Sequence, residues 1–272
     1  MKKKCVIIGT DLRLSYFHTA ISKDLNTKLV ATMTWDDELK NAIDQFEPQI
    51  VFLPIHPLKM ECPFILPASC EVLFVGKKNK EIDQEIERKE IQVFSYLEDE
   101  QYIWDNANLT AEGFINYFYT HEKQAIYNKQ FIITGYGRVG KRLAHALHHL
   151  GAKVVISVRS EHQLFEAKSY GYAIETLENV LDKQKSNSAY LINTIPSKWL
   201  ENTQASLFKQ VFDLASNPGC LLDTEENIPP NYALATSLPG MYFPQDAGLL
   251  IAQSVQNHLA FLKGEKSSGK GS

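Results

Sequence analysis

One glycine-rich segment constrains the fold of this chain more than any other part of the sequence. Residues 135–140 read GYGRVG, directly after an apolar run at 131–134 and directly before an amphipathic segment that extends to residue 150. A second apolar run follows at 153–158. A strand, a tight turn, a helix and another strand in this order form a β-α-β unit. The pattern therefore predicts a parallel α/β sheet in this half of the chain.

The same segment predicts a binding site for the pyrophosphate of a dinucleotide. In this spacing Gly135 allows the tight turn, Gly137 lets the backbone approach the phosphates, and Gly140 lets the helix pack closely on the strand. The N-terminus of the helix adds unpaired N–H groups and a partial positive charge. The alternative is a strand–helix turn that binds no ligand. The other residues expected in this cofactor site are Tyr136, Arg138 and Val139.

The residues after the second strand indicate which dinucleotide binds. NAD sites usually carry Asp or Glu at the end of this strand, where the carboxylate binds the ribose 2′-hydroxyl. Here Arg159 and Ser160 stand at that place, and the first acidic residue is Glu161. A guanidinium group is suited to bidentate contact with a phosphate. We therefore expect NADP as the cofactor. The alternative is that Arg159 is a surface arginine and that NAD binds.

Two later strands are expected to end at the same edge of the sheet. Asn193, Thr194 and Pro196 stand at the end of one apolar run, and Ser216 follows the next run. The carboxyl ends of parallel strands meet at one edge, where cofactor and substrate bind. We therefore expect these four residues to contribute to the cofactor site. The alternative for the Asn-Thr-x-Pro segment is an ordinary capped loop.

The first half of the chain also alternates between apolar and amphipathic runs, and it supplies the candidate catalytic residues. Asp11 and Arg13 follow the first expected strand, and His56 follows the third. Arg13 is suited to binding a substrate carboxylate. Asp11 is the first candidate for the proton acceptor and His56 is the second. The alternatives are a helix-capping aspartate, a surface arginine and a structural histidine.

The two alternating halves predict an α/β protein with two Rossmann-like parallel-sheet domains. A length of 272 residues agrees with two domains at about 150 residues each. We place a substrate or partner domain at residues 1–108, a linking helix at 109–127 and an NADP-binding domain at 128–246. The closing C-terminal helix at 247–263 is expected to pack back on the N-terminal domain. The Gly/Ser/Lys-rich tail at 264–272 is expected to be flexible.

Composition excludes several classes of protein. The chain has 28 Lys and Arg residues against 32 Asp and Glu, a net charge of −4, so it lacks the basic field that bulk nucleic-acid binding requires. Its four cysteines have no CxxC spacing, which argues against a disulfide framework or a metal site. No segment approaches the roughly 18 apolar residues of a membrane span. The lysine-rich start has no cleavage site, and we expect a cytoplasmic protein.

The ordered set of motifs in the second half resembles the family of the dipicolinate synthase A chain, its NADP-binding component. In the N-terminal third, residues 9–13 (GTDLR) resemble the family's opening Gly-Gly-Asp-x-Arg. The chain departs from the family pattern at Cys220, Ser237 and Asp246. The stretches that carry the resemblance are residues 110–113 (TAEG), 135–140 (GYGRVG), 150–154 (LGAKV), 159–160 (RS), 192–197 (INTIPS), 213–216 (DLAS), 218–219 (PG), 238–240 (LPG) and 247–248 (AG).

The resemblance implies a fold like that of formate and glycerate dehydrogenases. It also implies an NADP-dependent oxidoreductase that makes dipicolinate, as in spore-forming bacteria during sporulation. A cyclic dihydrodipicolinate-type dicarboxylate would be the substrate, and its hydride would pass to NADP. The expected partners are this small dicarboxylate and a second dipicolinate synthase subunit, and we also expect a homo-oligomer.

Three alternatives remain open. Residues 135–151 also resemble adenosylhomocysteinase and the 2-hydroxyacid dehydrogenases, which are NAD enzymes. The first usually carries an acid where Arg159 stands. The second needs an ordered Arg, Glu and His set, and the only histidine between Asp213 and Leu262 is His258, deep in the closing helix. The third alternative is an NADP-sensing or structural subunit whose partner performs the chemistry.

Overall fold

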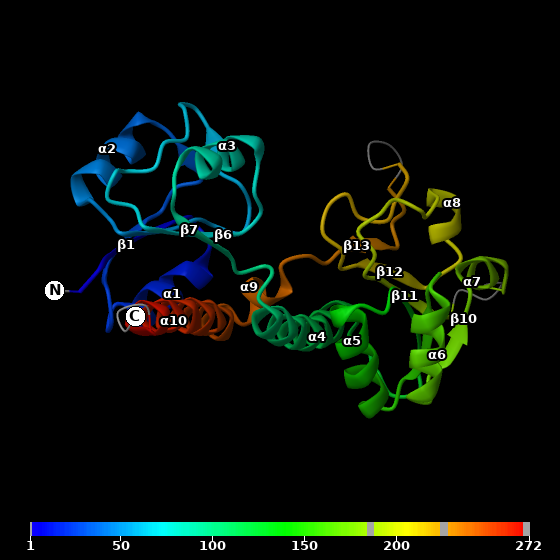
Figure 1. The fold of residues 1–272 in the computed structure, drawn as a ribbon. Helices are drawn as coiled ribbons and strands as arrows, with labels where there is room; N and C mark the ends of the chain where they lie inside the picture. Colours follow the sequence, from blue (N-terminus) through cyan, green and yellow to red (C-terminus); the bar gives the residue numbers. More distant parts are fainter. Residues whose placement is uncertain (1, 184–187, 224–227, 269–272) are drawn as a thin grey trace. The chain divides into compact units, whose positions relative to one another are not determined.

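The computed structural model describes residues 2–183, 188–223 and 228–268, and the chain divides into two compact units (Figure 1). Unit 1 comprises Met1–Asn106 and Phe243–Ser272, and unit 2 comprises Ala107–Tyr242. Each unit contains its own sheet of parallel strands with helices on both faces. The predicted α/β class is confirmed.

Unit 1 contains a five-stranded sheet in the order β2-β1-β4-β6-β7. A short parallel pair, β3-β5, lies outside this sheet. The elements of unit 1 are β1 (Lys4–Ile8), α1 (Leu12–Ile21), β2 (Asn26–Val30), β3 (Thr34–Trp35), α2 (Asp37–Phe46), β4 (Ile50–Phe52), β5 (Lys59–Met60), β6 (Val72–Val75), α3 (Lys80–Arg88), β7 (Gln92–Ser95) and α10 (Pro244–Ser268).

Side chains of the central strands point alternately to the two faces of this sheet, because successive residues of a strand face opposite sides. Ile7 packs in one core with residues of α1 and α10, whereas Val6 and Ile8 pack in the other with residues of α2 and α3. All three side chains are fully buried. Strands buried on both faces explain the continuous apolar runs in the sequence.

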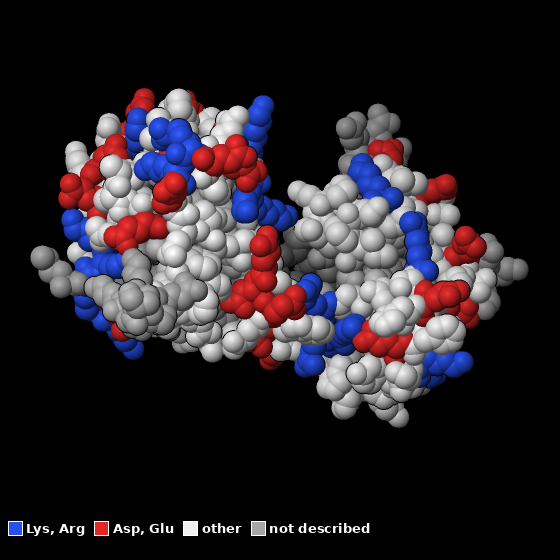
Figure 2. Space-filling view, viewed as in Figure 1, with Lys and Arg blue, Asp and Glu red and all other residues white. Residues whose placement is uncertain are grey.

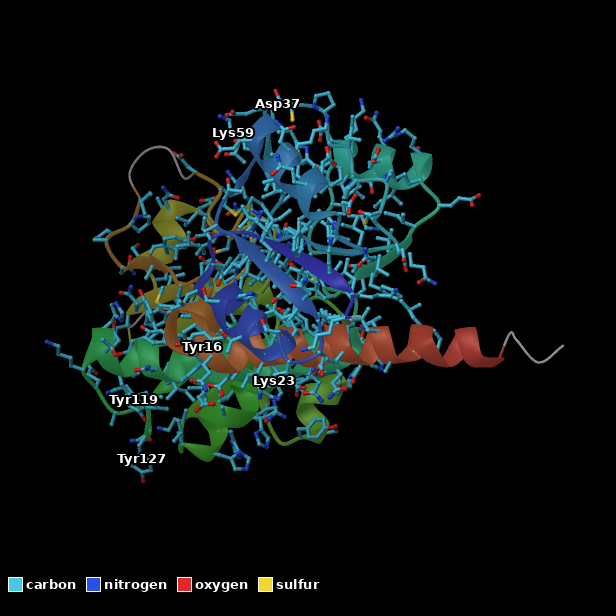
Figure 3. All side chains as sticks on the ribbon, turned by 90° about the vertical axis from the view of Figure 1, so that its left-hand side faces the viewer. Tyr16, Lys23, Asp37, Lys59, Tyr119 and Tyr127 are labelled. Carbon is cyan, nitrogen blue, oxygen red and sulfur yellow. The ribbon has the colours of Figure 1, made fainter. Side chains whose placement is uncertain are left out.

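The closing helix α10 packs on α1 within unit 1 (Figures 1 and 3). A Cβ atom added at Gly248 would lie 2.5 Å from the carbonyl oxygen of Arg13 and 2.8 Å from Cβ of Tyr16. Tyr16 lies beside α10 in Figure 3. The two helices therefore approach so closely that glycine is required at this position of α10.

The closing helix is longer than the sequence pattern predicted. It begins at Pro244, which suits the first turn of a helix, where the missing N–H is not needed. It continues to Ser268 and so includes residues 264–268 of the segment that was expected to form a flexible tail. Residues 269–272 of that predicted tail lie outside the described residues.

Unit 2 contains a six-stranded sheet in the order β10-β9-β8-β11-β12-β13. Helices α4, α5 and α6 contribute side chains to the core on one face, and α7 and α8 contribute to the core on the other. The elements of unit 2 are α4 (Glu100–Glu122, which begins in unit 1), β8 (Gln130–Thr134), α5 (Arg138–His149), β9 (Lys153–Ser157), α6 (Glu161–Ser169), β10 (Ala173–Glu175), α7 (Leu177–Lys183), β11 (Tyr190–Asn193), α8 (Asn202–Ala205), β12 (Gln210–Asp213), β13 (Tyr232–Leu234) and α9 (Leu238–Tyr242).

The helix predicted at residues 109–127 begins earlier and ends earlier than expected. Helix α4 starts at Glu100, because Oδ1 of Asp99 accepts a hydrogen bond of 3.2 Å from the backbone N–H of Tyr102. Side-chain acceptors of this kind stabilise the first turn of a helix. The helix ends at Glu122, and Lys123 then takes a positive φ of 51°.

Charged side chains of both signs are interspersed on each unit, on the face that Figure 2 shows. Among the described residues, no helix is both long enough and apolar enough to cross a membrane.

Candidate functional site

The glycine-rich turn of unit 2 lies where the strand order of the sheet reverses. Strand β8 has β9 on one side and β11 on the other, and the chain continues from β8 to β9. The crevice at such a switch point, outside the carboxyl ends of the strands, is where open α/β sheets bind ligands. The turn after β8 and the turn after β11 meet there, since a Cβ atom added at Gly135 would lie 2.4 Å from Oγ1 of Thr194.

The three glycines of the turn have the geometry that a pyrophosphate site needs. Gly135 has a φ of +91°, which side chains rarely tolerate. A Cβ atom at Gly140 would lie 2.3 Å from the carbonyl oxygen of Gly135, so only glycine fits there. At Gly137 a Cβ atom would meet no described atom within 4 Å, which leaves open space beside the backbone. Gly137 is the N-cap residue that precedes α5 and provides no side-chain cap, so N–H groups of the first turn can donate to an anion.

The residues after β9 stand where dinucleotide-binding domains contact the adenosine ribose. Arg159 and Ser160 are exposed and follow β9 after one buried residue, Val158. Oγ of Ser160 accepts a hydrogen bond of 3.5 Å from the N–H of Gln163 and so caps α6. The hydroxyl of Ser157, at the end of β9, is buried and has no hydrogen-bond partner among the described residues. Buried hydroxyls normally have a hydrogen-bond partner, and the Ser157 hydroxyl lacks one among the described residues.

The remaining predicted residues of the turn differ in exposure. The side chain of Tyr136 is buried in the core of unit 2, where burial raises the pKa of its hydroxyl to about 12, so only its backbone remains for a ligand. Val139 is half-buried. Arg138, Pro196 and Ser216 are exposed, like Arg159 and Ser160.

Buried polar side chains join the strand ends beneath the turn. Oδ1 of Asn193 accepts hydrogen bonds from Oγ1 of Thr134 at 2.9 Å and from Nε1 of Trp199 at 3.2 Å. Nδ2 of Asn193 donates to Oδ1 of Asp213 at 2.8 Å and to the carbonyl oxygen of Ile195 at 3.0 Å. Asn193 and Asp213 are fully buried. The Asn193 side chain therefore holds the turn in place from below and does not face a ligand.

Asp213 in turn fixes the loop after β12. Its Oδ1 accepts from the N–H of Ala215 at 3.1 Å, and its Oδ2 accepts from the N–H of Cys220 at 2.6 Å and from the hydroxyl of Tyr232 at 2.7 Å. Burial, together with the nearby Asp213 carboxylate, holds the pKa values of the Cys220 thiol and the Tyr232 hydroxyl well above their usual ranges. Both groups are therefore neutral donors. The sequence pattern did not single out Thr134 or Tyr232, since neither belongs to a recognisable motif.

The three candidate catalytic residues of unit 1 line one pocket. Strand β1 lies between β2 and β4, so its carboxyl end is a switch point of the same kind. A pocket of about 240 Å³ lies there, and Asp11, Arg13 and His56 line it. Drug-sized ligands occupy pockets of about 300–1,000 Å³, so this pocket suits a smaller molecule. Its other lining residues are Thr10, Leu14, Met33, Pro54, Ile55 and Ile251.

Asp11 and Arg13 form a tight pair in this pocket. Oδ1 of Asp11 accepts from the N–H of Arg13 at 2.9 Å and so caps α1. Nε of Arg13 donates to both carboxylate oxygens at 2.9 Å, and its Nη2 donates to Oδ2. Partial burial would raise the pKa of Asp11, but the hydrogen bonds and charge of Arg13 outweigh it, so the pKa is lowered. Arg13 is itself only 8% exposed.

A larger cavity, of about 960 Å³, lies at the opposite edge of the same sheet. Its lining includes the first residues of three strands, Ile50, Val72 and Gln92. Ligand sites of open parallel sheets lie outside the carboxyl ends of the strands. We therefore place the candidate site at the smaller pocket, which Asp11, Arg13 and His56 line.

Comparison with known proteins places unit 2 among dinucleotide-binding domains. Residues 117–194 match the family described as the S-adenosyl-L-homocysteine hydrolase NAD-binding domain. The D-isomer specific 2-hydroxyacid dehydrogenase from Lactobacillus delbrueckii ssp. bulgaricus, solved in an NAD complex, is 15% identical. That match covers 96% of this chain and 97% of the dehydrogenase, with a TM-score of 0.53. A dinucleotide-binding, dehydrogenase-like fold is thereby shown.

Two further comparisons span most of the chain. The dipicolinate synthase A chain of Bacillus subtilis is 31% identical over 211 residues, which cover 74% of this chain and 68% of that protein. The crystal structure of the corresponding chain from Bacillus halodurans has a TM-score of 0.76 at 24% identity, covering 95% of this chain and 98% of the other. The protein belongs to the family of the dipicolinate synthase A chain.

Proposed function

We propose that this protein is the NADP-binding subunit of an enzyme that oxidises a cyclic dihydrodipicolinate-type dicarboxylate to dipicolinate. The reaction removes two hydrogens from the ring, one as a hydride and one as a proton, and the gain of aromaticity supplies the driving force. NADP⁺, when bound, would supply the hydride acceptor. The protein must therefore bind the two reactants and accept one proton.

The single observation that carries the proposal is the arginine after β9 in a chain of this family. The turn of Gly135, Gly137 and Gly140 with the N-terminus of α5 would hold the pyrophosphate. Arg159 and the capping Ser160 would hold the 2′-phosphate, because a guanidinium binds phosphate oxygens through two parallel hydrogen bonds. Backbone groups near Thr194, Pro196 and Ser216 would complete the nicotinamide side of the site.

The pocket of unit 1 would bind the dicarboxylate. Arg13 would donate a hydrogen bond to one carboxylate, with Asp11 holding the guanidinium in position. Asp11 accepts four hydrogen bonds and has a lowered pKa, so it is a weak base. We therefore reverse the order expected from the sequence and propose the exposed imidazole of His56 as the proton acceptor.

A second subunit is part of the proposal. The B. subtilis relative is named as one subunit of dipicolinate synthase, which implies that its enzyme has another, and we propose a corresponding partner for this chain. We also propose a cytoplasmic location, which agrees with the four free cysteines of the structure, three of them buried.

The cofactor assignment is tested by titrating the full chain with NADPH and with NADH. Energy transfer from tryptophan reports binding, since Trp199 donates a hydrogen bond to Asn193 beside the turn. We expect NADPH to bind more tightly than NADH, and Arg159→Ala to weaken NADPH about tenfold while leaving NADH unchanged. Arg138→Ala is the matched control, because a pyrophosphate contact would weaken both dinucleotides alike. Equal NADPH and NADH affinities in the unaltered protein would contradict the assignment.

The reaction is tested by following NADPH formation with a freshly generated dihydrodipicolinate-type substrate. Turnover that is lost in His56→Ala and retained in Asp11→Asn would support the assigned roles.

A second candidate function is an NADP-binding subunit whose partner performs the chemistry. It is favoured because the Asp11–Arg13 pair leaves the imidazole of His56 as the one acid–base group among the residues that line the pocket. NADPH binding without turnover, in the presence and absence of the second subunit, would exclude this reaction.

A further inference from the structure

The charged groups of the unit 1 pocket cancel one another. Among the residues that line it, Asp11 and Arg13 carry opposite charges, and His56 contributes an imidazole. The guanidinium of Arg13 is held by both carboxylate oxygens of Asp11. A dicarboxylate carries two negative charges, so the pocket as lined does not offer the net positive charge that would balance them. A positively charged side chain at the rim would supply this charge.

Lys77 stands at this rim because two strand ends touch there. Gly76 follows β6, and a Cβ atom added to it would lie 2.6 Å from Cα of Ile55 and 2.7 Å from the carbonyl oxygen of Pro54. The backbone N–H of Lys77 donates a hydrogen bond of 2.8 Å to the carbonyl oxygen of Ile55. Pro54, Ile55 and His56 all line the pocket. The backbone of Lys77 is therefore hydrogen-bonded to Ile55, a residue that lines the pocket.

The side chain of Lys77 is suited to reach a ligand in the pocket. It is exposed, and its ammonium group lies at the end of a flexible four-carbon stem. Lys78 and Lys80 follow in the sequence, so the chain is positively charged as it leaves the sheet edge. Of the three lysines, Lys77 is the one whose own backbone is hydrogen-bonded to the wall.

We propose that Lys77 pairs with the second carboxylate of the dicarboxylate, while Arg13 binds the first. Lys77 would then be the residue that makes the pocket select a dicarboxylate over a monocarboxylate. The inference rests on the proposed function, since it assigns a role within the same site. It extends that function because neither the glycine turn nor the Asp11–Arg13 pair distinguishes one carboxylate from two.

The test uses the full chain with NADPH and two probe ligands, dipicolinate and the monocarboxylate picolinate. Calorimetric titration in metal-free buffer gives the Kd of each. We expect Lys77→Gln to raise the Kd of dipicolinate about tenfold, as for the loss of a hydrogen bond to a charged group, and to leave the Kd of picolinate unchanged. Lys77→Arg should restore most of the affinity. Added salt should weaken dipicolinate binding more in the unaltered protein than in Lys77→Gln.

Lys23→Gln is the matched control, since it removes one lysine charge from the same unit. Lys23 follows α1, which returns from the carboxyl end of β1 to the amino end of β2, so it lies at the opposite edge of the sheet (Figure 3). At physiological salt its charge is screened over that distance. We expect both Kd values to be unchanged in this variant.

Three results would overturn the inference. If Lys77→Gln binds dipicolinate as the unaltered protein does, Lys77 has no role, although the proposed function stands. If Lys77→Gln weakens dipicolinate and picolinate equally, it does not select the second carboxylate. If the unaltered protein binds NADPH but not dipicolinate, the proposed substrate is wrong and the role of Lys77 falls with it.

Discussion

Asn193 and Asp213 are joined by a hydrogen bond of 2.8 Å from Nδ2 to Oδ1, and both side chains are fully buried. The bond connects the carboxyl ends of the neighbouring strands β11 and β12. Thr134 at the end of β8 donates to the same asparagine. Three strand ends are thus linked by side chains directly beneath the dinucleotide turn. Satisfied polar networks of this kind specify one arrangement of the backbone around them.

Removing one donor from this network should lower stability. Tyr232→Phe deletes the hydroxyl that donates to Oδ2 of Asp213 at 2.7 Å, and it leaves the ring in place. Loss of a hydrogen bond to a buried carboxylate costs about 1–3 kcal/mol. Urea denaturation measures the free energy of unfolding. Tyr127→Phe is the control, since Tyr127 is 75% exposed and its hydroxyl projects outward in Figure 3, and this variant should match the unaltered protein.

Replacing two glycines of the turn with alanine should affect different properties: stability at Gly140 and NADPH binding at Gly137. Gly140→Ala places a Cβ atom 2.3 Å from the carbonyl oxygen of Gly135, and we expect it to destabilise the protein by about 1–3 kcal/mol. Gly137→Ala meets no described atom within 4 Å, so it should lower the melting temperature less than Gly140→Ala does, through the weaker N-cap alone. Its methyl group would instead fill the space of the pyrophosphate, and the Kd of NADPH should rise about tenfold or more. Unchanged NADPH binding by Gly137→Ala would argue against the site.

The contact between α1 and α10 should depend on Gly248. Gly248→Ala brings a Cβ atom within 2.5 Å of the carbonyl oxygen of Arg13, a backbone atom that cannot move without shifting α1. We expect a loss of about 1–3 kcal/mol, measured as a lower melting temperature. Gly264→Ala, in the last turns of the same helix, meets no described atom within 4 Å and should be neutral or slightly stabilising, because alanine favours helix. Equal melting temperatures of the two variants would refute the close approach.

Stability should depend on the charge of Asp11 in a defined pH range. Arg13 lowers the pKa of Asp11 from its ordinary value of 3.8, so the ionised carboxylate stabilises the folded state. This contribution is fully present above about pH 3.8 and is lost as the pH falls through the lowered pKa of the folded protein. Asp11→Asn removes the charge and keeps a good helix cap. The melting temperatures of the two proteins should differ at neutral pH and converge in acid. A constant difference would contradict the pairing.

The sequence predicted the local features of both halves well. The GxGxxG turn and the α5 pattern depend on neighbours within a few positions, and the structure places them in the elements expected. Asp11 caps α1, which the sequence offered only as the alternative to a proton acceptor. Element ends were predicted less well, because they depend on partners far along the chain. The sequence did not predict the pair β3-β5, in which the segment after β4 pairs with the segment before α2. Strands of two residues are too short to show an alternation of apolar and polar side chains.

The sequence by itself determined that this protein has α/β halves and a dinucleotide turn, since backbone freedom at glycine and apolar periodicity are local properties. Only the tertiary structure decided which strand ends are neighbours. That order brings His56 into the pocket of Arg13, Asn193 onto Asp213, and Lys77 against Ile55. These residues are 20 or more positions apart in the sequence, and the sheet order that joins them is set by the packing of whole helices and strands, which no local pattern encodes.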